Sequence, residues 1–504
     1  MNKKTYIAAI DQGTTSSRCV LFTTDGNIAA SEQFEHKQYY PRPGWVEHDP
    51  GEIWERTAAA VRGAMQKADA AAADIAAVGI TNQRETVLAW DPETGKAYGN
   101  AIVWQDTRTA ELVDKLCIPV QEDLRLKTGL PPATYFSAPT MAWMLEHHPA
   151  LAGAAASGRL CFGTIDSYLL WRLSGGPEGG VFFTDVTNAS RTQLVNLNTL
   201  TYDADLLSLF GIPRNSLPEI QPSIPEVPYA YTCAEGPFQG KVAICGMLGD
   251  QQAALFGQGC FSPGDIKNTY GTGCFLLMNT GETPVYSENG LLTTLAYQAG
   301  GRRPVYALEG SVAVAGALVQ WIRDNLGLIR NSGEIETLAR SVEDSGGVYF
   351  VPAFSGLFAP YWNSRARGLL IGLTGFAGAG HLARAVLEAT AFQTKEMFRA
   401  MEEDSGLQVA TLKADGGMVV NDLLMQFQAD ILNVPVVRPE VMETTALGAA
   451  YAAGLSAGVW DDFREISRQW TEGRRWMPEM DDTARRESYH YWRKAVDRAM
   501  DWVD

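Results

Sequence analysis

The hydrophobic residues of the chain form short apolar runs, several of which end in a cluster of glycine, hydroxyl or charged residues. Residues 5–10 (TYIAAI) and 19–23 (CVLFT) have the length and composition of buried strands, and DGN at 25–27 is a turn signal. DQGTTSSR, residues 11–18, separates these two runs. The pattern predicts a β-hairpin whose connecting segment carries an acid, a glycine, four hydroxyls and an arginine.

The second half of the chain repeats this pattern. DIKNT and CFLLMNTG have the composition of strands on either side of YGTG, residues 270–273. Because one such hairpin opens each half, we predict an α/β protein of two lobes, residues 1–254 and 255–504. Each lobe is expected to have helices on both faces of a β-sheet, with a cleft between the lobes. This arrangement is similar to the actin, hexokinase and Hsp70 ATPase fold, a ribonuclease H-like fold.

Three further stretches have a clear periodicity. Residues 409–432 predict a strand, the glycine pair Gly416-Gly417 and an amphipathic helix. Residues 241–259 predict a strand that runs into Asp250 and then a short helix. Residues 460–504, rich in Trp, Arg and Glu, have a helical pattern and predict a helical cap on the second lobe.

Composition and charge restrict the class of protein. Apolar residues make up 46% of the 504 residues and charged residues 20%, as in ordinary globular proteins. The net charge of −17 disfavours nucleic acid and anionic membrane surfaces as partners. No apolar run approaches the ~18 residues of a membrane span, and the run after Lys3 and Lys4 is too short for a signal peptide.

The cysteine and histidine spacings exclude two common kinds of site. The seven cysteines include no C-x-x-C pair and the six histidines no H-x-x-x-H spacing, so neither a zinc site nor a disulfide framework is predicted. Unpaired cysteines are typical of a reducing compartment, and we expect a cytoplasmic protein. We also expect a homo-oligomer, a dimer or a tetramer.

The first hairpin has the groups that a chain of phosphates needs. Gly13 allows the backbone to approach a ligand, and Arg18 adds a fixed cation. The backbone and hydroxyl groups of Thr14, Thr15 and Ser16 can donate to phosphate oxygens. The preceding strand ends in Asp11, which could hold Mg²⁺, because phosphate-bound Mg²⁺ usually needs only one or two carboxylates. No G-x-x-x-x-G-K-[ST] or G-x-G-x-x-G sequence is present, and an ordinary polar hairpin with an Asx turn is the alternative.

Polar residues at other strand ends indicate a site for a phosphate acceptor. Asp250 can accept the proton of an attacking hydroxyl, although a role as helix N-cap alone is the alternative. Arg84 and Glu85 offer a donor and an acceptor for the vicinal hydroxyls of a polyol, or they form a solvated surface pair. The rings of Trp104 and Tyr135 could pack against the CH face of such a molecule, or they belong to the hydrophobic core.

Motifs from residue 6 to about residue 455 resemble the FGGY family of carbohydrate kinases, and within it the bacterial glycerol kinases. GITNQRET is the most discriminating motif, because the pentulose kinases of the family differ there. The motifs are DQGTTSSR, PGWVEHDP, GITNQRET, NAIVWQ, TNASRT, GDQQAALFGQ, NTYGTGCF, ENGLLTT, YALEG, LMQFQADIL and TALGAAY.

The resemblance implies a role for each matching residue. Asp250 would be the general base in the ATP-dependent phosphorylation of glycerol to sn-glycerol 3-phosphate, by direct transfer, as the first step of glycerol catabolism. Asp11 matches the metal-associated aspartate of the family, for Mg²⁺. The positions that match the glycerol pocket are Arg84, Glu85, Trp104, Tyr135, Asp250, Gln251 and Phe275. The positions that match the ATP contacts are Thr14, Thr15, Ser16, Arg18, Thr272, Gly316, Gln320, Gly417 and Asn421.

One segment departs from the family pattern. Where enterobacterial relatives bind fructose 1,6-bisphosphate with Gly-Gly-Thr-Arg, this chain has FQGK at 238–241. Residues 226–241 also contain no histidine, the residue that is phosphorylated in other relatives. We therefore expect neither form of control.

Two alternatives to glycerol phosphorylation stay open. The nearer one is a kinase for another small polyol or ketose in the same fold. The other is an actin-like filament or chaperone ATPase, which would have no use for Arg84 and Glu85 beside Asp250.

Overall fold

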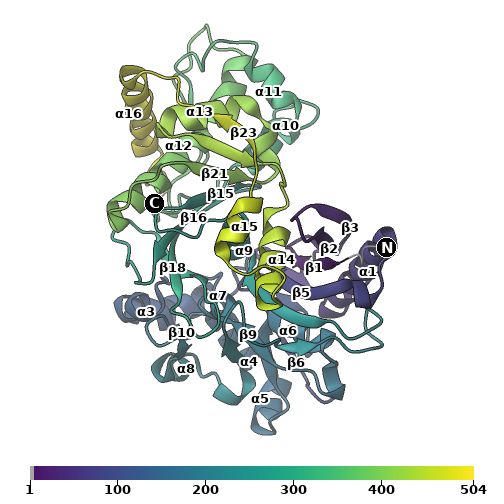
Figure 1. Ribbon diagram of the computed structural model, residues 1–504. Coiled ribbons are helices and arrows are strands. Elements are labelled where there is room, and N and C mark those ends of the chain that lie inside the picture. Colours follow the sequence, from purple (N-terminus) through teal and green to yellow (C-terminus); the bar gives the residue numbers. More distant parts are fainter. Residues whose placement is uncertain (1–4, 504) are drawn as a thin grey trace.

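The computed structural model of the chain describes residues 5–503, so that Lys3 and Lys4 lie outside the described residues. Two mixed β-sheets organise it, one of six strands and one of seven. Figure 1 shows them in separate parts of the molecule, with helices α9 (Asp250–Gly257) and α14 (Thr444–Ser456) between them. The predicted α/β architecture of two lobes, with helices on both faces of each sheet, is confirmed.

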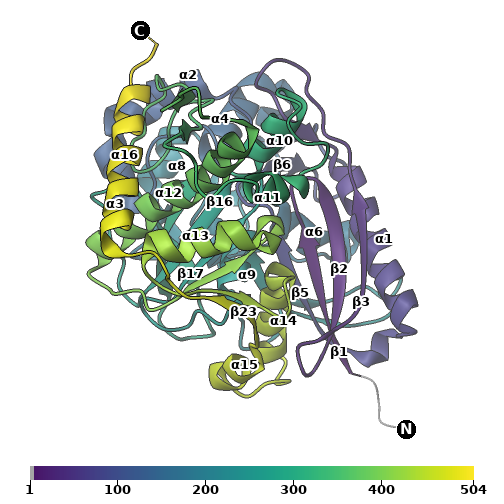
Figure 2. The same cartoon turned by 90° about the horizontal axis from the view of Figure 1, so that it is seen from above.

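The six-stranded sheet has the order β13-β14-β5-β1-β2-β3. Successive residues of β1 face opposite sides, as expected for a strand buried on both faces. Tyr6, Ala8 and Ile10 pack with α1 and α6, whereas Ile7 and Ala9 pack with α9 and α14. Figure 2 shows α1 alongside β3 at the outer edge. The bounds are β1 Tyr6–Gln12, β2 Ser16–Thr23, β3 Ile28–Glu35, β5 Ile75–Asn82, β13 Ala230–Tyr231, β14 Ala243–Gly249, α1 Pro50–Ala68 and α6 Ile165–Leu173.

The seven-stranded sheet has the order β17-β18-β16-β15-β21-β22-β23. In both sheets the first strand of the chain pairs antiparallel with the next strand on one side, and parallel with a later strand on the other. This common plan agrees with the duplication expected from the two hairpins. The bounds are β15 Ile266–Tyr270, β16 Cys274–Gly281, β17 Leu292–Tyr297, β18 Val305–Val312, β21 Leu412–Asp415, β22 Val436–Pro439, β23 Glu472–Trp476, α10 Gly316–Asp324, α12 Ala379–Ser405 and α13 Asp422–Leu432.

A smaller sheet of four strands, in the order β4-β7-β6-β8, lies beside the predicted acceptor residues. Arg84 and Glu85 occupy the turn between β5 and β6, Trp104 follows β7, and Tyr135 precedes α4. The bounds are β4 Glu47–His48, β6 Val87–Trp90, β7 Ala101–Ile102, β8 Cys161–Thr164 and α4 Ser137–His147.

The C-terminal segment differs from its prediction. Residues 460–504 were expected to be helical, but they form α15 (Phe463–Gln469), β23 and α16 (Asp482–Ala499). β23 pairs antiparallel with β22 at the edge of the seven-stranded sheet, and its Trp476 is buried. The helical prediction was therefore wrong for 472–476, because pairing with a sheet edge far away in sequence outweighs local propensity.

Helix α14 closes one face of the N-terminal sheet, although it lies late in the sequence. It packs on α9, β14, β5 and β1. Glycine allows the close approach: a Cβ on Gly448 would lie 1.8 Å from the carbonyl oxygen of Ala253, and one on Gly79 would lie 2.1 Å from that of Ala449. No helix in the described part of the chain is both long enough and apolar enough to span a membrane.

Candidate functional site

The first hairpin turns at Gly13–Thr15, where the Gly13 N–H donates to the Ser16 carbonyl at 2.8 Å. Asp11 and Arg18 face each other in register on β1 and β2, and Arg18 forms an ion pair with Glu443, just before α14. Burial, with the neighbouring carboxylates of Asp250 and Glu443, raises the pKa of Asp11 to about 6 despite Arg18. A cation bound beside Asp11 would stabilise its charged form and lower this pKa.

Side chains behind this hairpin fix its tip. Gln83 Nε2 donates to the Gly13 carbonyl at 3.2 Å, and Gln38 Nε2 donates to the Thr14 carbonyl at 3.0 Å. A ring nitrogen of His48 lies 2.6 Å from Gln38 Oε1. The carbonyl groups at the tip are therefore bound from the protein side, by residues to which the sequence analysis gave no role.

The second hairpin turns at Gly271–Gly273 and is joined to the start of α10. The Ala315 and Ala317 N–H groups donate to the Thr272 carbonyl at 3.0 Å, and the Gly316 N–H donates to the Gly271 carbonyl at 3.0 Å. A Cβ on Gly316 would lie 2.6 Å from that same Gly271 oxygen. Glycine at 316 is therefore required by this close approach of two backbones.

A cavity of about 370 Å³ opens beside the second hairpin. It is lined by Thr272, Gly316, Gln320, Gly417 and Asn421, which are the five residues predicted to contact ATP in the second half of the chain. A Cβ at Gly417 would meet open space, so this wall of the cavity is bare backbone. Asn421 Oδ1 caps α13 by accepting from the Leu424 N–H at 2.9 Å, which leaves its amide nitrogen for another partner.

Arg84 lies at the centre of the predicted acceptor site, and it is buried. Its guanidinium donates to both oxygens of Glu309, at 2.6 and 2.9 Å, and its Nε lies 3.1 Å from Asp250 Oδ1. Glu85 does not pair with it; Glu85 Oε1 accepts from Arg191 Nε at 2.6 Å. The alternative of a solvated Arg84–Glu85 surface pair is therefore wrong.

These charges form one buried network across the two halves of the chain. Arg191 also donates to Glu309 at 3.3 Å. Burial alone would raise the pKa of Glu309, but the Arg191 and Arg84 guanidiniums lower it to about 2. Burial raises the pKa of Glu85 above its usual range against the effect of both arginines. Glu85 also has a left-handed backbone, with φ of 62°, which is uncommon outside glycine and is found at functional sites.

The predicted aromatic residues lie next to this network. Trp104 Nε1 donates to Thr14 Oγ1 at 3.0 Å, which links the acceptor site to the first hairpin. Trp104 and Phe275 meet edge to face, with ring centroids 6.5 Å apart. Burial raises the pKa of the Tyr135 hydroxyl; the charge of Arg191 lowers this pKa and that of Glu309 raises it. The three rings thus come from three separate segments of the chain.

Asp250 is the first residue of α9, and the N-cap is Gly249, so the alternative of an Asp250 N-cap is wrong by one residue. Its side chain is 30% exposed, whereas its partner Arg84 is buried. The next residue, Gln251, accepts a hydrogen bond from the buried Lys267 on β15. The structure therefore brings Asp250, Gln251 and Arg84 together with the neck of the second hairpin.

Three buried charged residues of the site were not predicted from the sequence: Arg191, Glu309 and Lys267. Glu309 and Lys267 are lone charges on the strands β18 and β15, whereas Arg191 lies in a turn between Ser190 and Thr192. A charge on a buried strand is rare unless it is paired, so this pattern was a usable signal for a buried network. What the sequence could not supply was the identity of the partners, which lie far apart along the chain.

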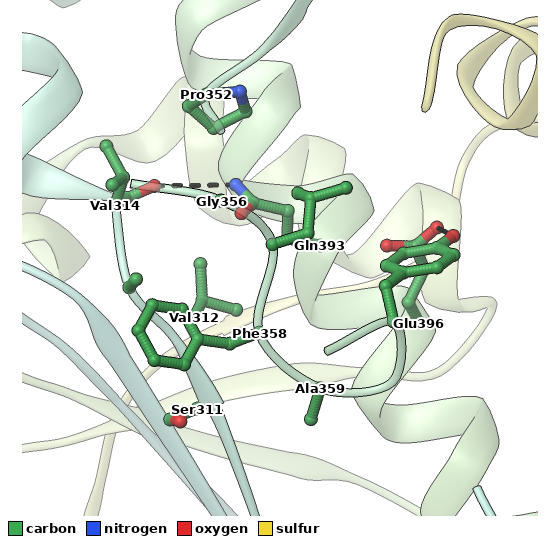
Figure 3. Close-up of a pocket in the computed structure, with 12 residues that line it drawn as sticks. Ser311, Val312, Val314, Pro352, Gly356, Phe358, Ala359, Gln393 and Glu396 are labelled. Atoms are coloured by element: carbon green, nitrogen blue, oxygen red, sulfur yellow. Dashed lines mark hydrogen bonds between the residues drawn. The ribbon is translucent and has the colours of Figure 1, made fainter. Parts of the chain in front are cut away.

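Figure 3 shows a smaller cavity, of about 20 Å³, between the end of β18 and the loop that carries Phe358 and Ala359. Gln393 of α12 borders it and donates to the Val314 carbonyl at 3.4 Å. Glu396 of α12 binds the indole N–H of Trp492 at 2.9 Å. The space suits a single water, and none of the predicted site residues lines it. Its lining residue Ser311 is the register partner of Phe275, so the cavity borders the candidate site.

The candidate metal position rests on few ligands. No group of three or more His, Cys, Asp or Glu residues within 5–503 could hold an ion by itself. Asp11, with Asp250 near it, fits the other mode of binding, in which Mg²⁺ is held mainly by phosphates and water.

The chain matches two protein-family models. Residues 6–257 match the N-terminal domain of the FGGY family of carbohydrate kinases, and residues 266–457 match the C-terminal domain of that family. A glycerol kinase of Beijerinckia indica is 57% identical over 501 residues, with 99% of each chain covered. A glycerol kinase of Mycobacterium tuberculosis is 57% identical over 500 residues, covering 99% of this chain and 97% of the relative.

Solved structures resemble the whole chain. The glycerol kinase of Plasmodium falciparum, crystallised with ADP, is 38% identical, with a TM-score of 0.91 and 98% of each chain covered. A xylulose kinase from Lactobacillus acidophilus has a TM-score of 0.83 at 22% identity, covering 98% of this chain and 97% of that one. The second likeness supports the fold alone.

Proposed function

The chain belongs to the FGGY family of carbohydrate kinases, and we propose that it transfers the γ-phosphoryl group of ATP to glycerol, giving ADP and sn-glycerol 3-phosphate. One observation carries the proposal at the site: Arg84 joins Asp250 at 3.1 Å, directly beside both phosphate hairpins. The full-length identity of 57% to glycerol kinases supports the same choice of acceptor.

The acceptor pocket suits a molecule with one hydroxyl face and one CH face. Arg84 can donate to a substrate hydroxyl through the second N–H of its Nη2, the first of which binds Glu309. Glu85 can accept from a hydroxyl through Oε2, because Arg191 binds its Oε1. Trp104, Phe275 and Tyr135 provide apolar surface for the carbon chain. Together these groups are proposed to fix glycerol with one terminal hydroxyl at Asp250.

Asp250 is proposed to act as the general base. Its carboxylate takes the proton of the terminal hydroxyl as that oxygen forms a bond to the γ-phosphorus and the bond from phosphorus to the bridging oxygen of ADP breaks. The partial exposure of Asp250 lets substrate reach it, while Arg84 fixes its orientation. Such transfer needs positioning and charge stabilisation, and no covalent enzyme intermediate.

The phosphates of ATP are proposed to lie between the hairpins, contacted by Thr14, Thr15, Ser16, Arg18 and Thr272. The adenosine would occupy the cavity lined by Gly316, Gln320, Gly417 and Asn421. Mg²⁺, held near Asp11 through water, would neutralise charge on the β- and γ-phosphate oxygens. Arg18 would then exchange its partner Glu443 for a phosphate.

The wider setting is also a proposal. We propose lobes at 1–254 and 255–504, a homo-oligomer, and a cytoplasmic enzyme at the first step of glycerol catabolism. All seven cysteines are free, and all but Cys233 are buried, as suits a reducing compartment.

Measurement of ADP release in a coupled assay tests the function directly. We expect the highest kcat/KM with glycerol, compared with dihydroxyacetone, erythritol and xylulose, and little ADP release in buffer alone. A preference for xylulose or erythritol would favour a different polyol or ketose kinase. ADP release that is equally fast without any acceptor would favour the filament or chaperone class of ATPase.

A further inference from the structure

Lys267 is a fully buried lysine on β15, at the neck of the second hairpin. Its ammonium donates to Thr269 Oγ1 at 2.9 Å, to the Phe275 carbonyl at 3.1 Å, and to Gln251 Oε1. An ammonium has three N–H donors and no acceptor, so all three protons are used.

The three acceptors belong to two different parts of the catalytic apparatus. Thr269 and Phe275 face each other in register on β15 and β16, so Lys267 bridges the two strands that carry the hairpin tip. Gln251 belongs to α9 and is the neighbour of Asp250. One side chain thus connects the hairpin of the second half of the chain to the helix that carries the proposed base.

We propose that Lys267 is a positioning residue for phosphoryl transfer, which sets the distance between the Asp250 carboxylate and the phosphoryl group at the second hairpin. The proposal rests on the proposed function. Lys267 does not contact glycerol in this scheme, since its donors are occupied. Its loss should therefore lower kcat more than glycerol affinity. Arg84 and Glu85 are the proposed main contacts of glycerol, although Gln251 and Phe275, which Lys267 binds, also belong to the predicted pocket.

Opposing effects of burial and of nearby charges determine the pKa of Lys267. Burial lowers its pKa to about 8, although the carboxylates of Asp415, Asp250 and Glu309 act in the opposite direction and Arg84 adds to the lowering. The neutral amine has only two N–H donors and cannot serve three acceptors. The charged and titratable groups that face it are Asp250, Arg84, Glu309, Asp415, Cys260 and Cys274. Burial raises the pKa of both thiols, so they stay neutral in this range.

The substitution Lys267→Met tests the role, since it keeps the length of the side chain and removes the charge. We expect kcat to fall roughly 10- to 100-fold, because a displacement of about 1 Å in a reacting group can cost 10²-fold. The glycerol Kd, measured by calorimetry, should change less than about threefold. If the wild-type enzyme prefers another acceptor, the proposed function is wrong. The kcat and Kd of wild type and Lys267→Met are then compared with that acceptor, so the role of Lys267 is still tested.

Lys413→Met is the matched control. Lys413 is the register partner of Lys267 on β21, but it donates to the Gln258 carbonyl at 2.6 Å and contacts the ring of Trp470, away from the hairpin tip. We expect this variant to retain kcat within about threefold of wild type.

The pH dependence of the wild-type enzyme gives a readout that does not depend on the folding of a variant. The protonated lysine is the active form, so kcat should fall as pH rises through about 8. Lys267→Met should lack this alkaline decline. A constant wild-type kcat between pH 7 and 10 would overturn the proposal. So would a Lys267→Met variant that keeps wild-type kcat, or one that loses glycerol affinity and kcat equally.

Discussion

Asp250 begins α9 with its carboxylate partly exposed and held by Arg84. Asp250→Asn keeps the size of the side chain but removes the proton acceptor. We expect kcat to fall by roughly 10²- to 10⁴-fold, the usual contribution of a general base, with a smaller change in glycerol Kd. Initial rates at saturating substrate, with calorimetry for binding, check this.

Asp482→Asn provides the control for that substitution, because Asp482 is likewise the first residue of its helix, α16, and is exposed to solvent. It should leave kcat unchanged. A folded Asp250→Asn enzyme with activity within tenfold of wild type would remove Asp250 from the role of base.

Arg84 uses the planar geometry of its guanidinium, since it reaches both oxygens of Glu309 and one oxygen of Asp250. Lysine retains the charge but not this fork. We expect Arg84→Lys to raise the glycerol KM roughly 10- to 100-fold, which corresponds to about 1.5–3 kcal/mol for a charge-assisted hydrogen bond, and to leave the ATP KM nearly unchanged. Steady-state kinetics with each substrate varied in turn measure both.

Arg384→Lys is a suitable comparison, because Arg384 also pairs with a carboxylate, Glu388 at 2.9 Å, but lies on α12. It should change neither KM. An Arg84→Lys enzyme with the wild-type glycerol KM would show that the guanidinium makes no contact with substrate.

At the scale of elements, the crossing of α14 and α9 depends on glycine. Gly448→Ala would place a methyl group 1.8 Å from the Ala253 carbonyl oxygen, and neither helix backbone can move freely. We expect the free energy of unfolding to fall by about 1–3 kcal/mol, as for other overpacked cores. Thermal and denaturant unfolding measure the change.

Gly153→Ala in α5 (Pro149–Ala156) is the control, since a Cβ there meets nothing within 4 Å. An exposed helical glycine replaced by alanine should stabilise slightly, by up to about 1 kcal/mol. If both alanine variants unfold alike, the close approach at the crossing does not limit stability.

The segment 238–241 also allows a prediction about regulation. Phe238 is fully buried in the core beside α1, and a Cβ on Gly240 would lie 2.5 Å from the Cβ of Ala72. Lys241 is exposed and offers a single point charge in place of a bidentate arginine. We expect millimolar fructose 1,6-bisphosphate and phosphocarrier proteins to leave activity unchanged. Inhibition by the sugar bisphosphate that Lys241→Ala abolishes would contradict this.

Local patterns predicted the elements around the site well. At both hairpins, at the strand before Asp250 and at the glycine pair before α13, the apolar runs and the turn residues predict the same elements. β23 was missed because five residues of mixed polarity carry no strand signal of their own; the edge of β22 stabilises them. Tertiary pairing of this kind cannot be read from one segment.

At the scale of the whole molecule, the duplicated plan was predictable from the sequence, but the path of the chain between its halves was not. The buried network of Arg84, Arg191, Glu85 and Glu309 joins residues up to 225 positions apart. Likewise α14 covers a sheet whose strands all precede it in the sequence. Residue spacing alone contains no information on such partners, so the sequence offered candidate site residues but not the side chains that hold them in place.

The position of α14 has a consequence for the synthesis of the protein. When all six strands of the N-terminal sheet have left the ribosome, Ile7, Ala9, Val20 and Phe22 still lack the helix that covers them. That apolar face stays open until residues 444–456 have been translated. The nascent first half of the chain therefore cannot fold completely on its own. Until residues 444–456 have been translated, its exposed apolar face makes it prone to aggregation and to binding by chaperones.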